Sequence, residues 1–271
     1  FRAWIQGGTY GAAGRVVLRG GTVAGGWFEP FYGLTIQSLA CDTNSTCATA
    51  VGPYGTGTTT FDVEDGVADP DLIMTENMTA NVTTFAKSGN GRMLFTGTSS
   101  SGAVTINAGA LQVGANGTSG NISAANVADN GALIFCRSDQ VIYSGVISGT
   151  GTVAQAGTNL LLLNGVNTFG SNLFVNAGTV WGSGSASNSS VIVAAGAEFG
   201  PTNSAIVNTF KVRNMTLAHD SRVGCLLNDA TPTIVVMTNL TTAGTNWVDI
   251  TAAVAATNGS YALIDYSGAI N

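Results

Sequence analysis

An internal repeat constrains the fold of this 271-residue chain more than any other feature. Segment 87–113 reads KSGNGRMLFTGTSSSGAVTINAGALQV, and segment 155–182 reads QAGTNLLLLNGVNTFGSNLFVNAGTVWG. Gly89 matches Gly157 at an offset of 68 residues, and the Asn-Ala-Gly triplets that follow match at an offset of 69. A repeat whose insertions fall in polar stretches is typical of a solenoid, because each copy packs on the copies before and after it.

Apolar residues alternate with polar residues inside each copy, as in Val104 and Ile106 or Leu173 and Val175. This period of two indicates β-strands with one buried face and one exposed face. The chain contains 37 Gly and only 9% charged residues, which is unlike the composition of surface helices. The sequence therefore predicts an all-β solenoid. We also expect the matching residues Leu111 and Val180 to point inward.

Segment 145–180, GVISGTGTVAQAGTNLLLLNGVNTFGSNLFVNAGTV, resembles the autotransporter-associated β-strand repeat. The matching positions are Gly149, Gly151, Gly157, Leu161, Leu163, Gly165, Asn167, Phe169, Gly170, Val175, Ala177 and Gly178. Segment 258–270 is similar to the closing strand of large secreted proteins that carry these repeats. The resemblance covers residues 87–271 and implies a right-handed parallel β-helix that is exported to the cell surface or beyond.

Residues 1–80 match this repeat poorly, so we expect two regions in the chain. Residues 1–80 would form an aromatic and acidic segment that caps the solenoid or mediates assembly, and residues 81–271 would form the solenoid repeats. The candidate assembly residues are aromatic: Phe1, Trp4, Trp27, Phe28 and Tyr32. Two interpretations remain open, a cap over the core and a contact surface for a neighbouring subunit. The second interpretation predicts a head-to-tail homopolymer, with residues 1–36 of one subunit packed on the next.

Four cysteines occur in the chain. Cys41 and Cys47 bracket the polar segment DTNST, and an even number of cysteines in an exported chain favours a disulfide between these two. Cys136 and Cys225 either pair or lie buried as small apolar residues.

Acidic residues are concentrated between Asp62 and Glu76, where six of the fifteen carboxylates of the chain fall. The candidate calcium ligands are Asp62, Glu64, Asp65, Asp69 and Asp71, because calcium takes six to eight oxygen ligands from flexible loops. The spacing is not that of an EF-hand, so the alternative is a solvated acidic loop that keeps the protein soluble. No other cofactor is expected.

Charge argues against several classes of partner. The net charge is −6, and the nine basic residues are scattered, so we expect no binding to nucleic acid. The longest apolar runs are too short to cross a bilayer, so no membrane insertion is expected.

His219-Asp220-Ser221 contains the residue types of a hydrolase triad, but adjacent residues of a strand point to opposite faces. We therefore predict no catalytic residues.

Three functions from different classes remain. The first is a non-enzymatic extracellular structural protein that self-assembles into a surface fibre, sheath or layer. The second is an adhesin or glycan-binding passenger domain, which would display a binding groove on one face of the solenoid. The third is a polysaccharide-degrading enzyme, which would need converging carboxylates and a base. We favour the first and expect an extracellular or cell-surface location, with a homo-oligomer or glycans as partners.

Overall fold

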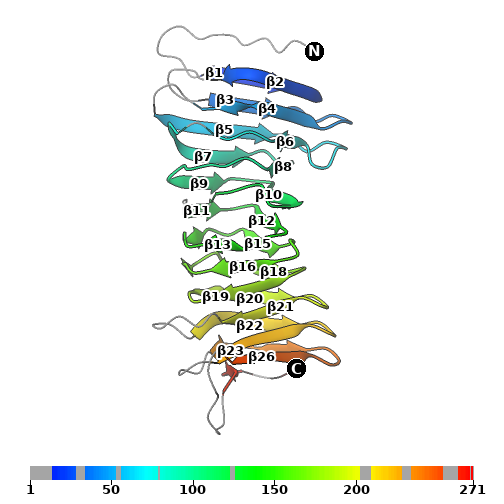
Figure 1. Cartoon of the computed structure of the whole chain (residues 1–271), viewed down its shortest axis with the longest axis vertical. Helices are drawn as coiled ribbons and strands as arrows, with labels where there is room; N and C mark the ends of the chain where they lie inside the picture. Colours follow the sequence, from blue (N-terminus) through cyan, green and yellow to red (C-terminus); the bar gives the residue numbers. More distant parts are fainter. Residues whose placement is uncertain are drawn as a thin grey trace. The chain divides into compact units, whose positions relative to one another are not determined.

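The structure is a computed structural model that describes residues 14–28, 34–52, 56–78, 80–122, 126–201, 209–227, 233–252, 262–268 and 270 (Figure 1). Every regular element in these ranges is a β-strand, and the strands pair in parallel. This confirms the predicted all-β parallel β-solenoid. The chain divides into two compact units, Phe1–Cys136 and Arg137–Asn271, which we call the N-terminal and C-terminal units.

The N-terminal unit contains two parallel sheets, and the chain alternates between them. One sheet has the order β1 (Gly14–Leu18), β3 (Leu34–Ser38), β5 (Gly57–Val63), β7 (Val82–Ser88), β9 (Ala103–Ile106) and β11 (Asn126–Asp129). The other has the order β2 (Gly21–Phe28), β4 (Ser45–Val51), β6 (Leu72–Met74), β8 (Arg92–Phe95), β10 (Ala110–Gly117) and β12 (Ala132–Arg137).

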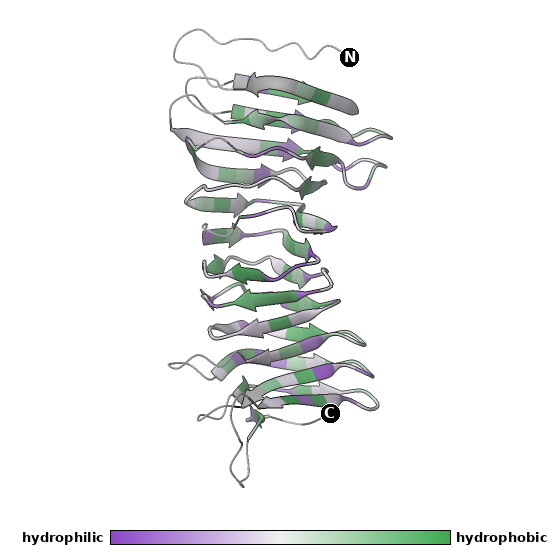
Figure 2. Cartoon of the chain, in the orientation of Figure 1, coloured by the Kyte–Doolittle hydropathy of each residue, from purple (hydrophilic) through white to green (hydrophobic). Residues whose placement is uncertain are grey.

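The core of this unit is built from columns of inward residues on successive strands. Ile36 lies opposite Phe61, and Lys87 lies opposite both Phe61 and Ile106. The ring of Phe85 makes edge-to-face contacts with two other phenylalanines, at centroid distances of 5.3 Å and 5.4 Å. Burying each such aromatic side chain contributes roughly 1.5–3 kcal/mol to the free energy of unfolding. Figure 2 shows apolar and hydrophilic residues alternating along the strands.

The C-terminal unit also alternates between two parallel sheets. One has the order β13 (Val141–Tyr143), β16 (Leu160–Leu163), β19 (Thr179–Gly182), β21 (Glu198–Pro201), β23 (Arg222–Leu227) and β26 (Trp247–Ala252). The other has the order β15 (Thr152–Gln155), β18 (Asn172–Val175), β20 (Ser185–Val193), β22 (Thr209–Leu217), β24 (Thr233–Val236) and β27 (Ile264–Tyr266). Three short strands complete the unit: β14 (Ile147–Ser148), β17 (Val166–Asn167) and β25 (Leu240–Thr242).

Inward positions of the C-terminal unit stack as the repeat predicts. Val180 lies between Leu161 and Phe199 on the neighbouring strands, and all three side chains are fully buried. Leu111 of the N-terminal unit is also fully buried, which confirms that the matching residues Leu111 and Val180 point inward. The four-leucine strand β16 alternates between buried and half-buried residues, so only one of its faces belongs to the core.

The Asn-Ala-Gly turns owe their recurrence to the glycine. Gly109 and Gly178 both adopt left-handed backbone angles, with φ of 65° and 58°. A Cβ atom at either position would also lie 2.5 Å from a backbone oxygen of the preceding turn. Only glycine satisfies both requirements, because it has no Cβ.

Strands lie on both sides of residue 80, and β6 pairs with β8 across it. The assembly role assigned to residues 1–80 stays a prediction. Phe1, Trp4 and Tyr32 lie outside the described residues. Trp27 and Phe28 end strand β2, where the structure describes only the backbone.

Candidate functional site

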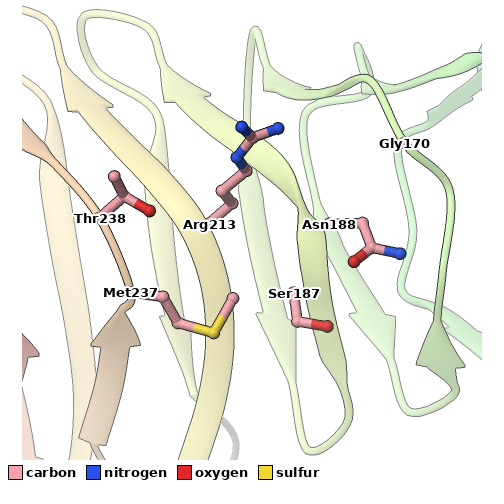
Figure 3. A pocket seen from close by; sticks show the side chains of 6 residues that line it. All are labelled: Gly170, Ser187, Asn188, Arg213, Met237 and Thr238. Carbon is pink, nitrogen blue, oxygen red and sulfur yellow. The ribbon is translucent and has the colours of Figure 1, made fainter.

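The C-terminal unit contains a surface cavity of about 450 Å³ (Figure 3). Six residues line it: Gly170, Ser187, Asn188, Arg213, Met237 and Thr238. They come from four successive turns of the chain, those that contain β18, β20, β22 and β24. Sequence reasoning did not select any of these residues as a site.

A register shift between β20 and β22 creates one wall of the cavity. Ala186 lies opposite Val212, whereas Ser190 lies opposite Asn214. Three residues of β20 therefore face a single residue of β22, Arg213. Such a bulge bends the strand and re-aims side chains, and it is common beside functional sites.

The opposite wall forms because strand pairing is interrupted between β24 and β25. Val236, the last residue of β24, lies opposite Val212, and Leu240, the first residue of β25, lies opposite Met215. The intervening segment 237–239 passes beside Arg213. The backbone N–H of Thr238 donates a hydrogen bond of 2.9 Å to the carbonyl oxygen of Arg213, which fixes this segment against β22.

Hydrogen bonds between turns also hold the bulge. The Nδ2 atom of Asn188 donates a hydrogen bond of 3.2 Å to the carbonyl oxygen of Thr168. The buried hydroxyl of Ser189 donates a hydrogen bond of 2.6 Å to the carbonyl oxygen of Phe169. These contacts hold the part of β20 that carries Ser187 and Asn188 against the preceding turn.

Several polar groups in the cavity keep their binding capacity. Within the described part of the chain, the guanidinium of Arg213, the hydroxyls of Ser187 and Thr238 and the Oδ1 atom of Asn188 make no hydrogen bond or ion pair. Figure 3 shows Arg213 on β22, between Ser187 and Asn188 of β20 and the segment that carries Met237 and Thr238. The arrangement can bind a small polar ligand, and Arg213 favours a negatively charged one.

The acidic residues predicted to bind calcium make other contacts. The carboxylate of Asp71 is buried and accepts hydrogen bonds from the backbone N–H groups of Gly66, at 2.7 Å, and Arg92, at 2.8 Å. Glu64 accepts one of 3.1 Å from the N–H of Ala40, and Asp69 pairs with the Arg92 side chain at 2.5 Å. These contacts order the loops of the N-terminal unit.

No group of three or more His, Cys, Asp or Glu side chains in the described ranges could hold a metal ion. The calcium-binding role of Asp62, Glu64, Asp65, Asp69 and Asp71 stays a prediction.

None of the four cysteines is in a disulfide, so the predicted bridge between Cys41 and Cys47 is not formed. Cys47 lies at an inward position of β4 and is fully buried in the core. Cys41 lies in the preceding loop, where it is half-buried and its thiol donates a hydrogen bond to the carbonyl oxygen of Thr43. Burial raises the pKa of the Cys47 thiol to about 11. No disulfide joins Cys136 and Cys225 either.

The segment His219-Asp220-Ser221 connects two turns of the solenoid. Each of its side chains accepts a hydrogen bond from the next turn: His219 Nδ1 from the Thr245 backbone at 3.1 Å, Asp220 Oδ1 from Trp247 Nε1 at 2.6 Å and Ser221 Oγ from Asn246 Nδ2 at 3.0 Å. These contacts direct the three side chains toward different residues and give them a structural role.

Buried polar side chains at strand ends are a further feature that sequence reasoning missed. Lys87, Asp129 and Gln155 end strands β7, β11 and β15 or lie next to their ends, and each is at most 3% exposed. Gln155 donates from Nε2 to the carbonyl oxygens of Gly157 and Asn159, at 3.1 Å and 2.8 Å. The signal in the sequence is their spacing, because each lies two residues after a buried apolar residue.

Comparison with known proteins gives a limited likeness. The chain is 50% identical over 54 residues to a protein described as "Adhesin BmaC autotransporter" from Brucella suis biovar 1 (strain 1330). The matched segment covers 20% of this chain and 2% of the length of that protein. No model of a protein family and no solved structure matches the chain. In the described residues, no helix is both long enough and apolar enough to span a membrane. The likeness supports the resemblance to autotransporter passenger regions.

Proposed function

We propose that this chain is a non-enzymatic passenger segment of a cell-surface adhesin. The observation that carries the proposal is its 50% identity over 54 residues to a protein described as an autotransporter adhesin. That segment is a small part of either protein, so binding targets and location are part of the proposal. The proposal places the chain at the cell surface or outside the cell.

The solenoid supports this function physically. Parallel strands with buried inward residues give a rigid scaffold, because each turn is hydrogen-bonded to its neighbours. The outward positions of the same strands lie outside the core and can contact a partner. The cavity around Arg213 is one such outward site, formed by a bulge that leaves the inward residue Ala186 fully buried.

An adhesion assay tests the proposal. Fluorescent beads coated with the purified chain should be retained on epithelial monolayers or on surfaces coated with extracellular matrix. Beads coated with the Val180→Asp variant are the control, because this substitution places a charge in the core and should unfold the C-terminal unit. Retention of wild-type beads at the level of uncoated beads on every surface would contradict the proposal.

A second candidate function is self-assembly into a homopolymer, and strand β26 favours it. Val248 and Ile250 lie opposite Val223 and Cys225 of β23, which are each only 2% exposed. Although they occupy the same inward register, Val248 and Ile250 are 53% and 56% exposed. A second copy of the chain that stacked on β26 would bury these two residues and pair the strand edge.

Sedimentation velocity tests self-assembly over a range of concentrations. Wild-type protein should form larger species as its concentration rises, and Val248→Lys with Ile250→Lys should stay monomeric. Val166→Lys is the control, because Val166 is 65% exposed and does not lie on β26. Removal of residues 1–36 tests the predicted docking arm in the same assay. A wild-type chain that stays monomeric throughout would exclude this function.

A further inference from the structure

Two cations on strand β22 have no ionic partner among the described residues. In the C-terminal unit, Arg137 pairs with Asp139 at 2.6 Å, and Arg222 pairs with Asp249 at 2.8 Å. Lys211 and Arg213 make no ion pair in this part of the chain. They lie two residues apart on one strand, so both project from its outer face, and both are exposed. The outer face of β22 is thus locally positive in a chain whose net charge is −6.

The groups around Arg213 match the chemistry of a sugar. The guanidinium can bind a carboxylate or sulfate with two parallel hydrogen bonds. The hydroxyls of Ser187 and Thr238 and the Oδ1 atom of Asn188 can bind sugar hydroxyls as donors and acceptors. Met237 is 40% exposed in the cavity and offers an apolar surface for the C–H face of a sugar ring.

The size and the chemistry of the cavity limit the classes of ligand that fit it. A cavity of about 450 Å³ falls within the roughly 300–1,000 Å³ of small-molecule sites. A nucleic acid is disfavoured, because none of the residues lining the cavity has an aromatic side chain on which a base could stack. A neutral sugar would leave the Arg213 guanidinium without a counter-charge.

We infer that the cavity around Arg213 is a subsite for one anionic sugar residue of an acidic polysaccharide. Arg213 binds the carboxylate or sulfate group, Lys211 adds attraction for the next charged residue of the polymer, and Ser187, Asn188 and Thr238 bind ring hydroxyls. Arg213 is well placed for this role because it lies on a strand that is paired on both sides, rather than on a mobile loop. The inference rests on the proposed adhesin function and names its ligand class.

Biolayer interferometry with the full chain and three polymers tests the subsite. Hyaluronate carries only carboxylates, dextran sulfate carries only sulfates, and dextran is neutral. We expect the chain to bind at least one of the two anionic polymers and not dextran, and the polymer that binds identifies the anion. Binding to neither anionic polymer, or equally to dextran, overturns the inference.

Variants separate a built site from general charge attraction. Arg213→Gln should weaken binding at least tenfold, whereas Arg19→Gln should change it less than twofold. Arg19 is a matched control, because it is exposed, lies in the N-terminal unit and makes no hydrogen bond or ion pair with the residues that the structure describes. Equal losses in the two variants would overturn the inference. Unchanged melting temperatures of both variants show that the losses are not due to unfolding.

The adhesion assay distinguishes failure of the subsite from failure of the adhesin function. If beads coated with Arg213→Gln adhere as well as wild-type beads, the subsite inference fails and the adhesin proposal stands. If wild-type beads adhere to no surface while the chain still binds an anionic polymer through Arg213, the subsite stands and the adhesin proposal fails.

Discussion

The Nζ atom of Lys87 donates a hydrogen bond of 3.2 Å to the carbonyl oxygen of Ala108, one solenoid turn further along the chain. The same atom donates to the carbonyl oxygens of Ser88 and Gly89, both at 2.8 Å. The three protons of the ammonium group thus satisfy three carbonyl oxygens where two turns of the N-terminal unit meet. This is how a fully buried lysine is accommodated in the core column between Phe61 and Ile106.

Replacing Lys87 by leucine should therefore destabilise the protein, because carbonyl oxygens would lose their donor inside the core. The expected cost is about 2–4 kcal/mol in the free energy of unfolding, measured by urea denaturation. Lys87→Gln should cost less, because Gln155 of the second repeat copy already satisfies two carbonyl oxygens from the matching position. If leucine is tolerated as well as glutamine, the hydrogen bonds of Lys87 do not stabilise the fold.

Lys87 should also make stability depend on pH in the alkaline range. Burial lowers its pKa from 10.5 to about 8, although nearby Asp62 and Asp71 oppose this shift. Between pH 8 and 10.5 the unfolded chain binds more protons than the folded protein, so the free energy of unfolding rises with pH. The stability of wild type relative to Lys87→Gln should increase by up to about 3 kcal/mol across this window. A constant difference between the two proteins would show that the Lys87 pKa is not shifted.

Asp129 should have the opposite effect in the acidic range. Burial raises the pKa of its carboxyl from 3.8 to about 6, and its Oδ2 atom has no hydrogen-bond partner among the residues that the structure describes. The folded protein holds this proton more tightly, so the stability that it contributes is present below pH 3.8 and is lost as pH rises through about 6. Urea unfolding between pH 4 and 7 should show wild type losing about 3 kcal/mol relative to Asp129→Asn. Parallel curves for the two proteins would exclude this linkage.

The strands could be predicted from the sequence because their signal is local. Residues such as Val104 and Ile106 alternate with polar ones, and glycines at matching positions mark the turns. The same alternation places Lys87 on the inward face, since it follows the buried Phe85 by two residues on β7. Lysine is seldom fully buried, but parity within the strand decides the position of Lys87.

The cavity could not be predicted, because it depends on how neighbouring turns align. In the sequence Arg213 reads as one outward polar residue of a strand. The cavity around Arg213 forms because β20 contributes two extra residues between Ala186 and Ser190, and no local feature of the sequence sets the register of that pairing.

The cysteine prediction was wrong for a related reason. The sequence spacing of Cys41 and Cys47 allowed a bridge, but strand β4 begins between them and buries only the second.

Thiol labelling checks the free cysteines. Under native conditions a maleimide should label the half-buried Cys41 and Cys136, and it should label the buried Cys47 and Cys225 only after denaturation. Burial and a pKa of about 11 both keep Cys47 out of its reactive thiolate form at neutral pH. Denatured protein should take up four labels without any reductant. If Cys41 and Cys47 were labelled only after reduction, a bridge would join them.

Val180 tests the register of the repeat. Its side chain is fully buried between Leu161 and Phe199, so Val180→Asp would place an unpaired carboxylate inside the apolar column. The expected loss is about 3–5 kcal/mol, enough to unfold a marginally stable unit. Val166→Asp makes the same change at a residue that is 65% exposed and should alter the melting temperature little. Circular dichroism melts of the three proteins give the comparison. A Val180→Asp variant that melts with wild type would mean that this side chain does not face the core, and the alignment of the two repeat copies would have to shift by one residue.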